Sequence, residues 1–555
     1  MEHPTNHRGL YALAAVPPLL VLTPVIGLVV LAFHGETELW RHLAAYVLPD
    51  ALQQTAILLA GTIVIATIAG AGTAWLVTGF GFPGRRWFEW ALLLPLAMPT
   101  YIVAYAYMDV LHPIGPVQTA LRAILGIHEI RGLILPDIRS MPGCIFVMGF
   151  ALYPYVYLST RAALMMQSAE AIEAARSLGA AGATLLRRVT LPIASPAIGV
   201  GIGLVMMEVL ADIGASEFLG VRTLTVAVYV TWTTRGSVEG AAQIALVMLA
   251  LTFALVAAER AQARRRDRAG GAGERLPLRT VLTGPAAVAA ALGCAVPLLI
   301  GFVVPTIHLL VNSFIRIVEF GLPPQLATWM WNSARLAALA TAATVGAGFL
   351  LAFCHRHLGG RATTVLVRIS SLGYALPGTV LAVGLLGPMS WFDEAIAAVL
   401  DLIPLAAPAL SGSTAALVLA YVLRFLAMPV NTLESAYGRI PRTIDDAARG
   451  LGAPDSALAL RVHLPLLAPA VAASALLVLI DCMKELPATL LLRPLNVETL
   501  ATSIYAEASR GTYEDGAVAA LAIVLVGLIP VVILVRGFGP RRASRPRAEP
   551  RLMPI

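Results

Sequence analysis

Four acidic residues and one lysine lie within two of the most apolar segments of the chain. Glu208 and Asp212 are four residues apart in the segment VMMEVLAD. Asp481 and Glu485 have the same spacing in the segment LIDCMKE, which also contains Lys484. Residues four apart lie on one face of a helix, and charged residues in membrane-spanning helices usually face a cavity or a partner. The pattern therefore indicates a translocation path or a gate for a cationic solute.

A structural ion-pair network that locks these helices to their neighbours would need the same residues. Lys484 follows Asp481 by three residues, so it can neutralise part of the acidity within its own helix. Asp212 precedes an Ile-Gly step and Glu485 precedes a Leu-Pro step, where a helix is expected to break. We expect Asp212 and Glu485 to be the stronger candidates for the path. The network interpretation stays open for each of these residues.

Other polar side chains are interpreted as structural. Tyr101, Tyr105 and Tyr107 carry phenol groups, which can bind ferric iron, but tyrosines near a membrane interface are common. A tight iron site also needs carboxylate and imidazole ligands, and the sequence indicates no such set of ligands with these tyrosines. Two histidines flank Arg356 in the sequence HRH, residues 355–357, and a solvated basic loop accounts for them. We predict no metal site and no catalytic residue.

The single lysine also excludes one kind of nucleotide site. Lys484 follows a methionine, whereas the phosphate-binding loop of many ATPases needs a Gly-Lys-Ser/Thr sequence. This chain therefore cannot build that loop, and we expect it to bind no cofactor itself. The four cysteines stand singly in or beside apolar runs and make no disulfide framework: Cys144, Cys294, Cys354 and Cys482.

The composition indicates that the elements that carry these residues lie in a lipid bilayer. Of 555 residues, 58% are hydrophobic and 13% are charged, whereas soluble domains carry about 25% charged residues. An apolar run of about 20 residues can cross a bilayer as a helix. We therefore predict an all-α integral membrane protein with about 12 transmembrane helices. The predicted spans are near residues 10–33, 55–79, 89–109, 142–164, 195–215, 241–258, 283–312, 332–354, 364–388, 413–430, 468–492 and 516–536. We expect the first run to be a span and not a cleaved signal peptide.

The spans fall into two groups of six, separated by a charged, Gly-rich segment that predicts a solvated linker. Arginines in this linker, in the tail and in the short loops at 85–86 and 356–361 lie on one side if both termini are cytoplasmic. The net charge of +7 thus indicates orientation in a membrane and not binding to nucleic acid. The predicted units are a first half at 1–258 (core about 52–258), a linker at 259–280, a second half at 281–537 (core about 328–537) and a basic cytoplasmic tail at 538–555.

The two halves repeat one polar segment in the same register. EAARSLGAAGATLLRRVTLP starts at Glu173, and DAARGLGAPDSALALRVHLP starts at Asp446, 273 residues later. At this offset the halves align without a gap to Glu217, which pairs Glu208 with Asp481 and Asp212 with Glu485. A GAG sequence at Gly70–Gly72 also recurs at Gly346–Gly348. Each half contributes six spans, so the two copies have the same orientation, which is a parallel repeat.

The second copy predicts a short helix, a glycine and a second short helix on the cytoplasmic side. The spacing from Thr443 to Asp446 is similar to a capping box. Gly452 is expected to end the first helix in the left-handed conformation, and Pro454 to begin the second, which would end before Leu464–Pro465. A single copy could be an ordinary interfacial loop. Two copies with identical internal spacing indicate a protruding element to which a partner protein binds.

This repeated pattern resembles the EAA loop of the permeases of ATP-binding-cassette (ABC) importers: an acid, two alanines, a glycine four residues on, and a later β-branched residue before Leu-Pro. The matching residues of the first copy are Glu173, Ala174, Ala175, Gly179, Val189, Leu191 and Pro192, and those of the second are Asp446, Ala447, Ala448, Gly452, Val462, Leu464 and Pro465. Asp446 departs from the family's Glu, which shortens the reach of the carboxylate.

The resemblance implies that each loop is a coupling helix that docks in a groove on a cytoplasmic ATPase. Two loops imply two ATPase copies, which bind ATP and Mg²⁺ in place of this chain. It also implies the fold of two tandem six-helix permease units of the MetI-like, type I importer class. The chain itself would be a transporter subunit and not an enzyme.

The segments KELPATLLLRP and LPLAMPTYIVAYAY resemble the fused two-half permeases of iron(III) importers. This implies an inner-membrane protein that accepts iron(III) from a periplasmic iron(III)-binding protein. Permeases of the same architecture serve thiamine, polyamines and other small solutes, and these alternatives stay open. An ion-coupled secondary transporter has no reason to keep two coupling loops at fixed spacing. A membrane-embedded enzyme would need a nucleophile or metal cluster that the sequence does not indicate.

Overall fold

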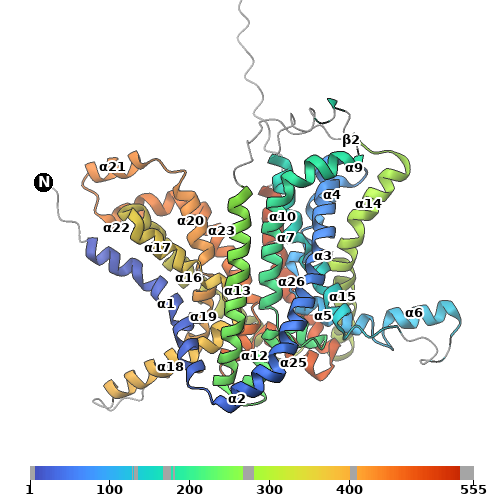
Figure 1. Ribbon diagram of the computed structural model, residues 1–555, viewed down its shortest axis with the longest axis horizontal. Helices are drawn as coiled ribbons and strands as arrows, with labels where there is room; N and C mark the ends of the chain where they lie inside the picture. The colour runs from blue at the N-terminus through green and yellow to red at the C-terminus, as the bar shows by residue number, and fades with distance from the viewer. Residues whose placement is uncertain are drawn as a thin grey trace, which may run out of the picture.

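The computed structural model describes residues 7–127, 129, 135–166, 175, 177–178, 182–266, 280–400 and 409–537. These residues are almost entirely helical (Figure 1). In the labels, η marks a short 3-10 or π-helical turn. The helical elements before residue 267 are α1 (His7–Phe33), α2 (Thr37–His42), η1 (Leu43–Val47), α3 (Leu48–Gly79), α4 (Arg85–Ala91), η2 (Leu94–Ala97), α5 (Thr100–Val110), α6 (Pro116–Leu125), α7 (Met141–Met166), α9 (Gly182–Leu185), η4 (Leu186–Thr190), α10 (Leu191–Ala211), α11 (Gly214–Phe218), α12 (Leu224–Thr233) and α13 (Val238–Arg266).

The second half contains a matching set of elements. They are α14 (Gly284–Leu298), η6 (Leu299–Val303), α15 (Val304–Phe320), α16 (Leu326–Leu358), α17 (Gly360–Ser370), η7 (Gly373–Ala375), α18 (Gly378–Leu400), α19 (Thr414–Phe425), α20 (Ala427–Tyr437), α21 (Arg442–Gly450), α22 (Asp455–Ala457), η8 (Leu458–His463), α23 (Leu464–Met483), α24 (Pro487–Leu492), α25 (Leu500–Arg510) and α26 (Tyr513–Gly537). One parallel strand pair, β1 (Phe80–Gly81) with β2 (Thr280–Val281), joins the end of α3 to the start of this half.

Ten helices among the described residues are long and apolar enough to cross a membrane, and two bent helix pairs raise this number to twelve. The first bent pair runs through Arg85–Ala97 and Thr100–Val110, with a bend of 91°. The second, Thr414–Phe425 with Ala427–Tyr437, bends by 43°. The first bend follows from Pro99, because proline disfavours a helical conformation in the residue before it. The predicted count of about twelve spans is thus confirmed only when each bent pair is taken as one span.

Apart from the two bent pairs, three predicted spans differ from the structure in where the helix stops. The predicted span 195–215 ends as a helix at Ala211, and the predicted span 468–492 ends at Met483. The predicted span 364–388 is interrupted between α17 and α18. The apolar run continues through each break, so hydropathy alone could not locate it. The predicted linker begins inside α13, which extends to Arg266; its remainder, 267–279, and the tail 538–555 lie outside the described residues.

In each half, the second, fourth and fifth spans pack against one another and form a core. These contacts join α3, α7 and α10 in the first half and α16, α20 and α23 in the second. A Cβ atom on Gly70 would lie 2.6 Å from the Tyr153 carbonyl oxygen, and one on Gly348 would lie 2.8 Å from the Pro429 ring. In contrast, a Cβ atom on Gly72 or on Gly346 would meet no atom within 4 Å. The two GAG sequences are therefore offset by two residues in structural register.

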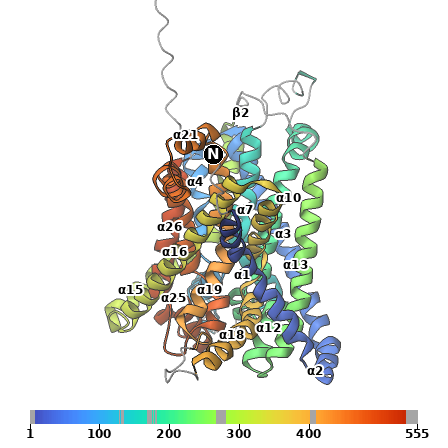
Figure 2. The ribbon, with the colours of Figure 1, turned by 90° about the vertical axis from the view of Figure 1, so that its left-hand side faces the viewer.

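The first span of each half packs on the other half. Helix α1 lies against α16, α17 and α18 of the second half, and α14, η6 and α15 lie against α3, α7 and α5 of the first half, so the chain crosses over twice (Figures 1 and 2). Gly27 and Gly384 make the close crossing of α1 and α18: a Cβ on Gly27 would lie 2.2 Å from the Gly384 carbonyl oxygen. His308 Nε2 of α15 lies 2.9 Å from Asp109 Oδ2 of α5. These contacts hold the two halves together as one membrane body.

The elements outside the spans gather at two ends. Helices α9, α21 and α22 lie at the upper end in Figure 1, which we call the loop end because it carries the repeated loops. Helices α2, α12 and α25 lie at the lower end, which we call the opposite end. Helices α10 and α23 both start at the loop end and run toward the opposite end. Each ends at the acidic residues that the sequence singled out.

Candidate functional site

The second repeated loop is a short helix followed by a left-handed glycine. Helix α21 carries Asp446 and Ala447 exposed and Ala448 half-buried. Gly452 has a φ of +78°, a conformation that glycine adopts at little cost, so the predicted helix stop is confirmed. Leu464 and Pro465 begin helix α23. The acid and first alanine of the motif therefore face outward, where a partner can touch them.

Three local predictions for this loop are wrong. Helix α21 begins after Pro441 and no side chain caps it, so Thr443 and Asp446 form no capping box. Pro454 precedes helix α22 and does not lie within it. The second short helix does not end before Leu464, because the π-helical turn η8 continues directly into α23. Pro465 lies in the first turn of α23, where proline is tolerated although it has no N–H to donate. It therefore does not interrupt the run.

The first repeated loop is described only in part. Glu173, Ala174 and Gly179 lie outside the described residues, whereas Ala175 is helical and half-buried. Leu191 and Pro192 begin α10 through the π-helical turn η4, in the same way as their counterparts begin α23. The two copies therefore join their span in the same geometry.

An ion-pair cluster ties the second loop to α16. The Arg356 guanidinium donates from Nε to Asp445 Oδ2 at 2.8 Å and from Nη2 to Oδ1 at 3.2 Å. Arg356 also donates to the Tyr437 and Ile440 carbonyl oxygens, each at 2.9 Å. His463 Nε2 lies 2.9 Å from Asp445 Oδ1. The loop is thus fixed to the end of a spanning helix, so a movement of the loop would be transmitted to that helix.

The electrostatics of this cluster favour the ionised carboxylate. Burial acts to raise the pKa of Asp445, but the hydrogen bonds from Arg356 and His463 outweigh it and hold that pKa below its usual value. The sequence HRH at 355–357 is therefore not a solvated loop. These residues form the last turn of α16; His355 lies 3.4 Å from Glu434, and His357 lies 3.3 Å from Asp455. The prediction failed because every partner is distant in sequence.

Two leucines missed by the sequence reasoning occupy matching places in the two loops. Leu178 is 87% exposed and Leu451 is 89% exposed. They are related by the same offset of 273 residues that relates the two motifs. Exposed apolar side chains can mark interaction sites. Because a leucine is exposed at the equivalent position of both loops, we interpret the two leucines as parts of a contact surface. The repeat offset was the signal that could have found them.

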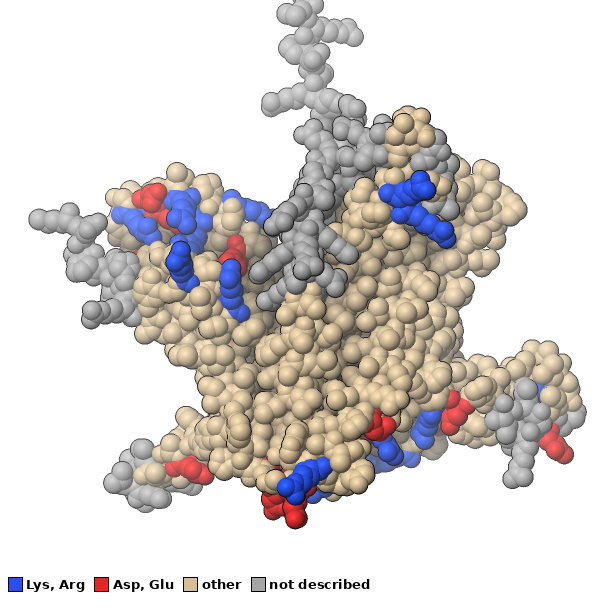
Figure 3. Space-filling view, in the orientation of Figure 1, with Lys and Arg blue, Asp and Glu red and all other residues tan. Residues whose placement is uncertain are grey.

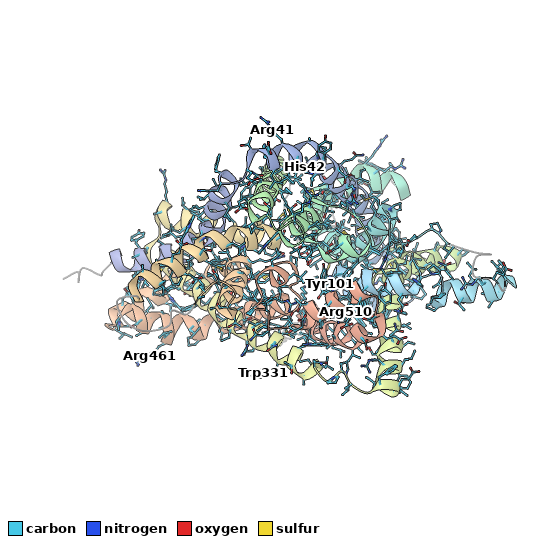
Figure 4. The ribbon with its side chains drawn as sticks, turned by 90° about the horizontal axis from the view of Figure 1, so that it is seen from below. Arg41, His42, Tyr101, Trp331, Arg461 and Arg510 are labelled. Carbon is cyan, nitrogen blue, oxygen red and sulfur yellow. The ribbon has the colours of Figure 1, made fainter. Side chains whose placement is uncertain are left out.

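All five charged residues of the predicted path line one cavity between the two halves. The cavity has a volume of ≈ 160 Å³. Glu208, Asp212, Asp481, Lys484 and Glu485 line it, together with Tyr101, Tyr155, Tyr374 and Arg424. Seen from the opposite end, Tyr101 lies near the middle of the molecule, whereas Arg41, Trp331 and Arg461 lie toward its edges (Figure 4). The cavity is therefore central and is shared by both halves.

Asp212 and Glu485 hold the broken ends of their helices. Asp212 Oδ2 accepts from the Ser216 backbone N–H at 2.9 Å, and its Oδ1 accepts from the Thr100 hydroxyl at 2.6 Å. Glu485 Oε2 accepts from the Thr489 backbone N–H at 3.0 Å, and Oε1 accepts from Arg424 Nη1 at 2.7 Å. Both carboxylates thus cap a short helix. This geometry favours the structural interpretation for the two acids that we expected to be the stronger path candidates.

Glu208, Asp481 and Lys484 have looser surroundings. Lys484 Nζ lies 2.8 Å from Asp481 Oδ1, so the predicted neutralisation within the helix is present. Glu208 Oε1 accepts a hydrogen bond from the Tyr155 hydroxyl at 3.1 Å. These side chains come from the ends of α10 and α23, one helix from each half, and they remain partly accessible. Their position favours contact with a solute that passes between the halves.

Arg424, Tyr101, Tyr155 and Tyr374 were not predicted to belong to the cavity. Arg424 lies inside an apolar span, and the cost of such an arginine was a signal that the sequence reasoning did not use. Tyr101 was interpreted as an interfacial tyrosine, but it is only 4% exposed. Its hydroxyl finds no hydrogen-bond partner among the described residues. Tyr107 is structural, because its hydroxyl donates to the Ile300 carbonyl oxygen at 2.8 Å.

Comparison with known proteins gives two family matches and several full-length or partial relatives. A family model described as binding-protein-dependent transport system inner membrane component matches residues 63–268 and 344–544. The Fe(3+)-transport system permease protein FbpB 2 of Haemophilus influenzae is 23% identical over 490 residues, which cover 87% of this chain and 89% of that protein. The sulfate transport system permease protein CysW of Escherichia coli is 29% identical over 201 residues, 36% of this chain and 66% of that protein. The molybdenum transport system permease protein ModB of Escherichia coli is 28% identical over 204 residues, 36% of this chain and 86% of that protein.

Proposed function

The chain belongs to the family of binding-protein-dependent transport system inner membrane components, and from this premise we propose that it carries iron(III) as the permease subunit of an ABC importer. Membership makes it a multi-pass inner-membrane transporter subunit with two tandem permease units. The identity of the solute is the step beyond the family.

The charge of the central cavity carries the proposal of a cationic solute. Its carboxylates outnumber its cationic groups, because Glu208, Asp212, Asp481 and Glu485 face only Lys484 and Arg424. A low-dielectric site with surplus negative charge attracts cations and repels anions such as sulfate and molybdate. The similarity to an Fe(3+)-transport permease, which extends over 87% of this chain, supports iron(III) in particular.

The loop end is the proposed docking surface for two copies of a cytoplasmic ATPase. Leu178 and Leu451 offer one exposed apolar side chain in each loop, and exposed Asp446 and Ala447 lie beside the second. Arginine side chains gather at the two corners of this end (Figure 3), which is the distribution expected of a cytoplasmic face. Both termini would then lie in the cytoplasm.

The proposed mechanism is alternating access. Closure of the two ATPases around ATP and Mg²⁺ would draw the loops at Glu173 and Asp446 together. Because Asp445 is bonded to Arg356 of α16, such a pull on the second loop passes directly into a spanning helix. The cavity would open toward a periplasmic iron(III)-binding protein docked at the opposite end. ATP hydrolysis would return it to the inward-open state, and no bond of the solute is made or broken.

The test is ATP-dependent uptake by the reconstituted complex of this chain, its ATPase and its binding protein in liposomes. We expect uptake of radiolabelled iron(III) only with ATP inside and the binding protein outside. Sulfate, molybdate, thiamine and spermidine serve as competitors, and none should reduce iron uptake. Stimulation of ATP hydrolysis by one of these solutes, and not by iron(III), would overturn the assignment. Gradient-driven uptake without any ATPase would contradict the importer mechanism itself.

A further inference from the structure

Glu208 and Asp481 form an unequal pair across the two halves. They occupy equivalent positions at the ends of α10 and α23 and line the same cavity. Asp481 is paired with Lys484, whereas the position equivalent to Lys484 in the first half is Ala211. The cavity therefore holds two equivalent acids, and the ammonium of Lys484 is paired with the acid of the second half.

The choice of lysine at this place is informative. Lysine and arginine together number 39 in the chain, and Lys484 is the only lysine. An arginine would form a bidentate, planar contact with a carboxylate and hold it firmly. Lysine carries a compact ammonium on a flexible stem, which can leave its partner and return. Lys484 also stands where α23 has just ended, so its backbone is outside the regular helix.

A second observation points to an occupant in this cavity. Tyr101 lines it and is only 4% exposed, and its hydroxyl has no hydrogen-bond partner among the described residues. A buried polar group without a partner is costly and suggests that a bound species completes it. The cavity volume of ≈ 160 Å³ is large enough for an ion with ordered water. Carboxylate and water oxygens are ligands that hard cations prefer.

We propose that Glu208 and Asp481 form a cation-binding site in the translocation path and that the Lys484 ammonium occupies it as an internal counter-ion when no substrate is present. A substrate cation of higher charge displaces the ammonium from Asp481. A small monovalent cation does not, because it competes with a tethered ammonium of equal charge. Lys484 thus keeps an acidic path from leaking sodium ions. The inference rests on the proposed transport of a cationic solute, but the leak is a property of this chain and can be measured without iron.

The test is sodium permeability of liposomes that contain the complex of this chain with its ATPases. A sodium-sensitive dye inside reports influx driven by an inside-negative potential, with no ATP, binding protein or iron present. We expect Lys484→Met to raise the sodium leak by about tenfold or more, because removal of the cation that lies 2.8 Å from Asp481 Oδ1 leaves that carboxylate to attract another cation. Lys484→Arg, which keeps the charge, should stay as tight as the wild type.

A double variant separates this role from damage to the packing. In Asp481→Asn/Lys484→Met the acid and the cation are both removed, so we expect the leak to fall back to near the wild-type level. A Lys484→Met complex as tight as the wild type would overturn the proposal. A leak that persists in the double variant would also overturn it, because the leak would then come from loosened helices. Neither result bears on the iron assignment, which stands or falls on the uptake assay.

Discussion

Arg356 of α16 and Asp445 of the second loop are joined by two hydrogen bonds, of 2.8 and 3.2 Å. Both side chains are 9% exposed. This pair is the principal polar link between the loop and a spanning helix. Removal of one partner leaves the other buried and uncompensated, which is costly. The pair therefore bears on both the stability of the protein and the transmission of force from an ATPase.

Asp445→Asn should lower the free energy of unfolding by about 1–3 kcal/mol and reduce the apparent Tm of the detergent-solubilised protein by several degrees. Because the pKa of Asp445 lies below its usual value in the folded protein, its contribution is fully present above the unfolded pKa of about 3.9. It is lost as the pH falls through the lower folded pKa. The Tm difference from wild type should thus be constant near neutral pH and close in acid.

Asp446→Asn is the matched control, because Asp446 is the exposed neighbour on the same helix. We expect it to leave Tm unchanged while it weakens ATPase binding. Equal Tm values for the two variants at neutral pH would contradict the anchoring role of Asp445.

Leu451→Asp should weaken ATPase binding about 30-fold, since a central apolar contact of an interface is worth about 2 kcal/mol. Leu178→Asp should do the same for the second ATPase copy. Both leucines are almost fully exposed, so neither change should alter Tm. Binding is measured by titration of the purified ATPase into the permease in nanodiscs. Leu495→Asp is the control, because Leu495 is equally exposed but lies between α24 and α25 at the opposite end. Unchanged affinity for Leu451→Asp would show that the ATPase docks elsewhere.

Glu217→Gln should stabilise the protein at neutral pH. Burial raises the pKa of Glu217, and the hydrogen bond from Tyr505 at 2.6 Å offsets this only in part. The charged carboxylate therefore costs the folded state free energy at pH above the folded pKa, and this cost vanishes below the unfolded pKa of about 4.3. We expect the Tm of Glu217→Gln to exceed that of the wild type near pH 8 and to equal it near pH 4. A lower Tm for Glu217→Gln at pH 8 would mean that the charge itself stabilises the contact between the halves.

The sequence predicts well those features that depend on nearby residues. The apolar runs indicate the spans, and the spacing of three between Asp481 and Lys484 predicts an ion pair that the structure contains. The repeat offset pairs Glu208 with Asp481, and both residues line one cavity. These succeed because helical periodicity and a duplicated segment are local signals.

The features that were missed depend on residues far apart in the chain. Arg356 and Asp445 are 89 residues apart, and α1 packs on the other half. No periodicity in one segment reports on such a pairing. The capping role of Asp212 was missed for a different reason. An acid before a helix break has the same sequence pattern whether it caps the next helix or faces a solute.

The crossing of α1 over α18 yields the last prediction. A Cβ atom on Gly384 would lie 2.2 Å from the Pro24 carbonyl oxygen, a backbone atom that cannot move aside without moving the helix. Gly384→Ala should therefore separate the two helices and cost about 1–3 kcal/mol. Gly346→Ala is the control, because Gly346 lies within α16 and a Cβ there meets no atom within 4 Å. This control should be stabilising by up to about 1 kcal/mol, since alanine is the better helix former. Thermal unfolding of both variants in the same detergent compares them, and a Gly384→Ala protein as stable as Gly346→Ala would show that the crossing does not hold the halves together.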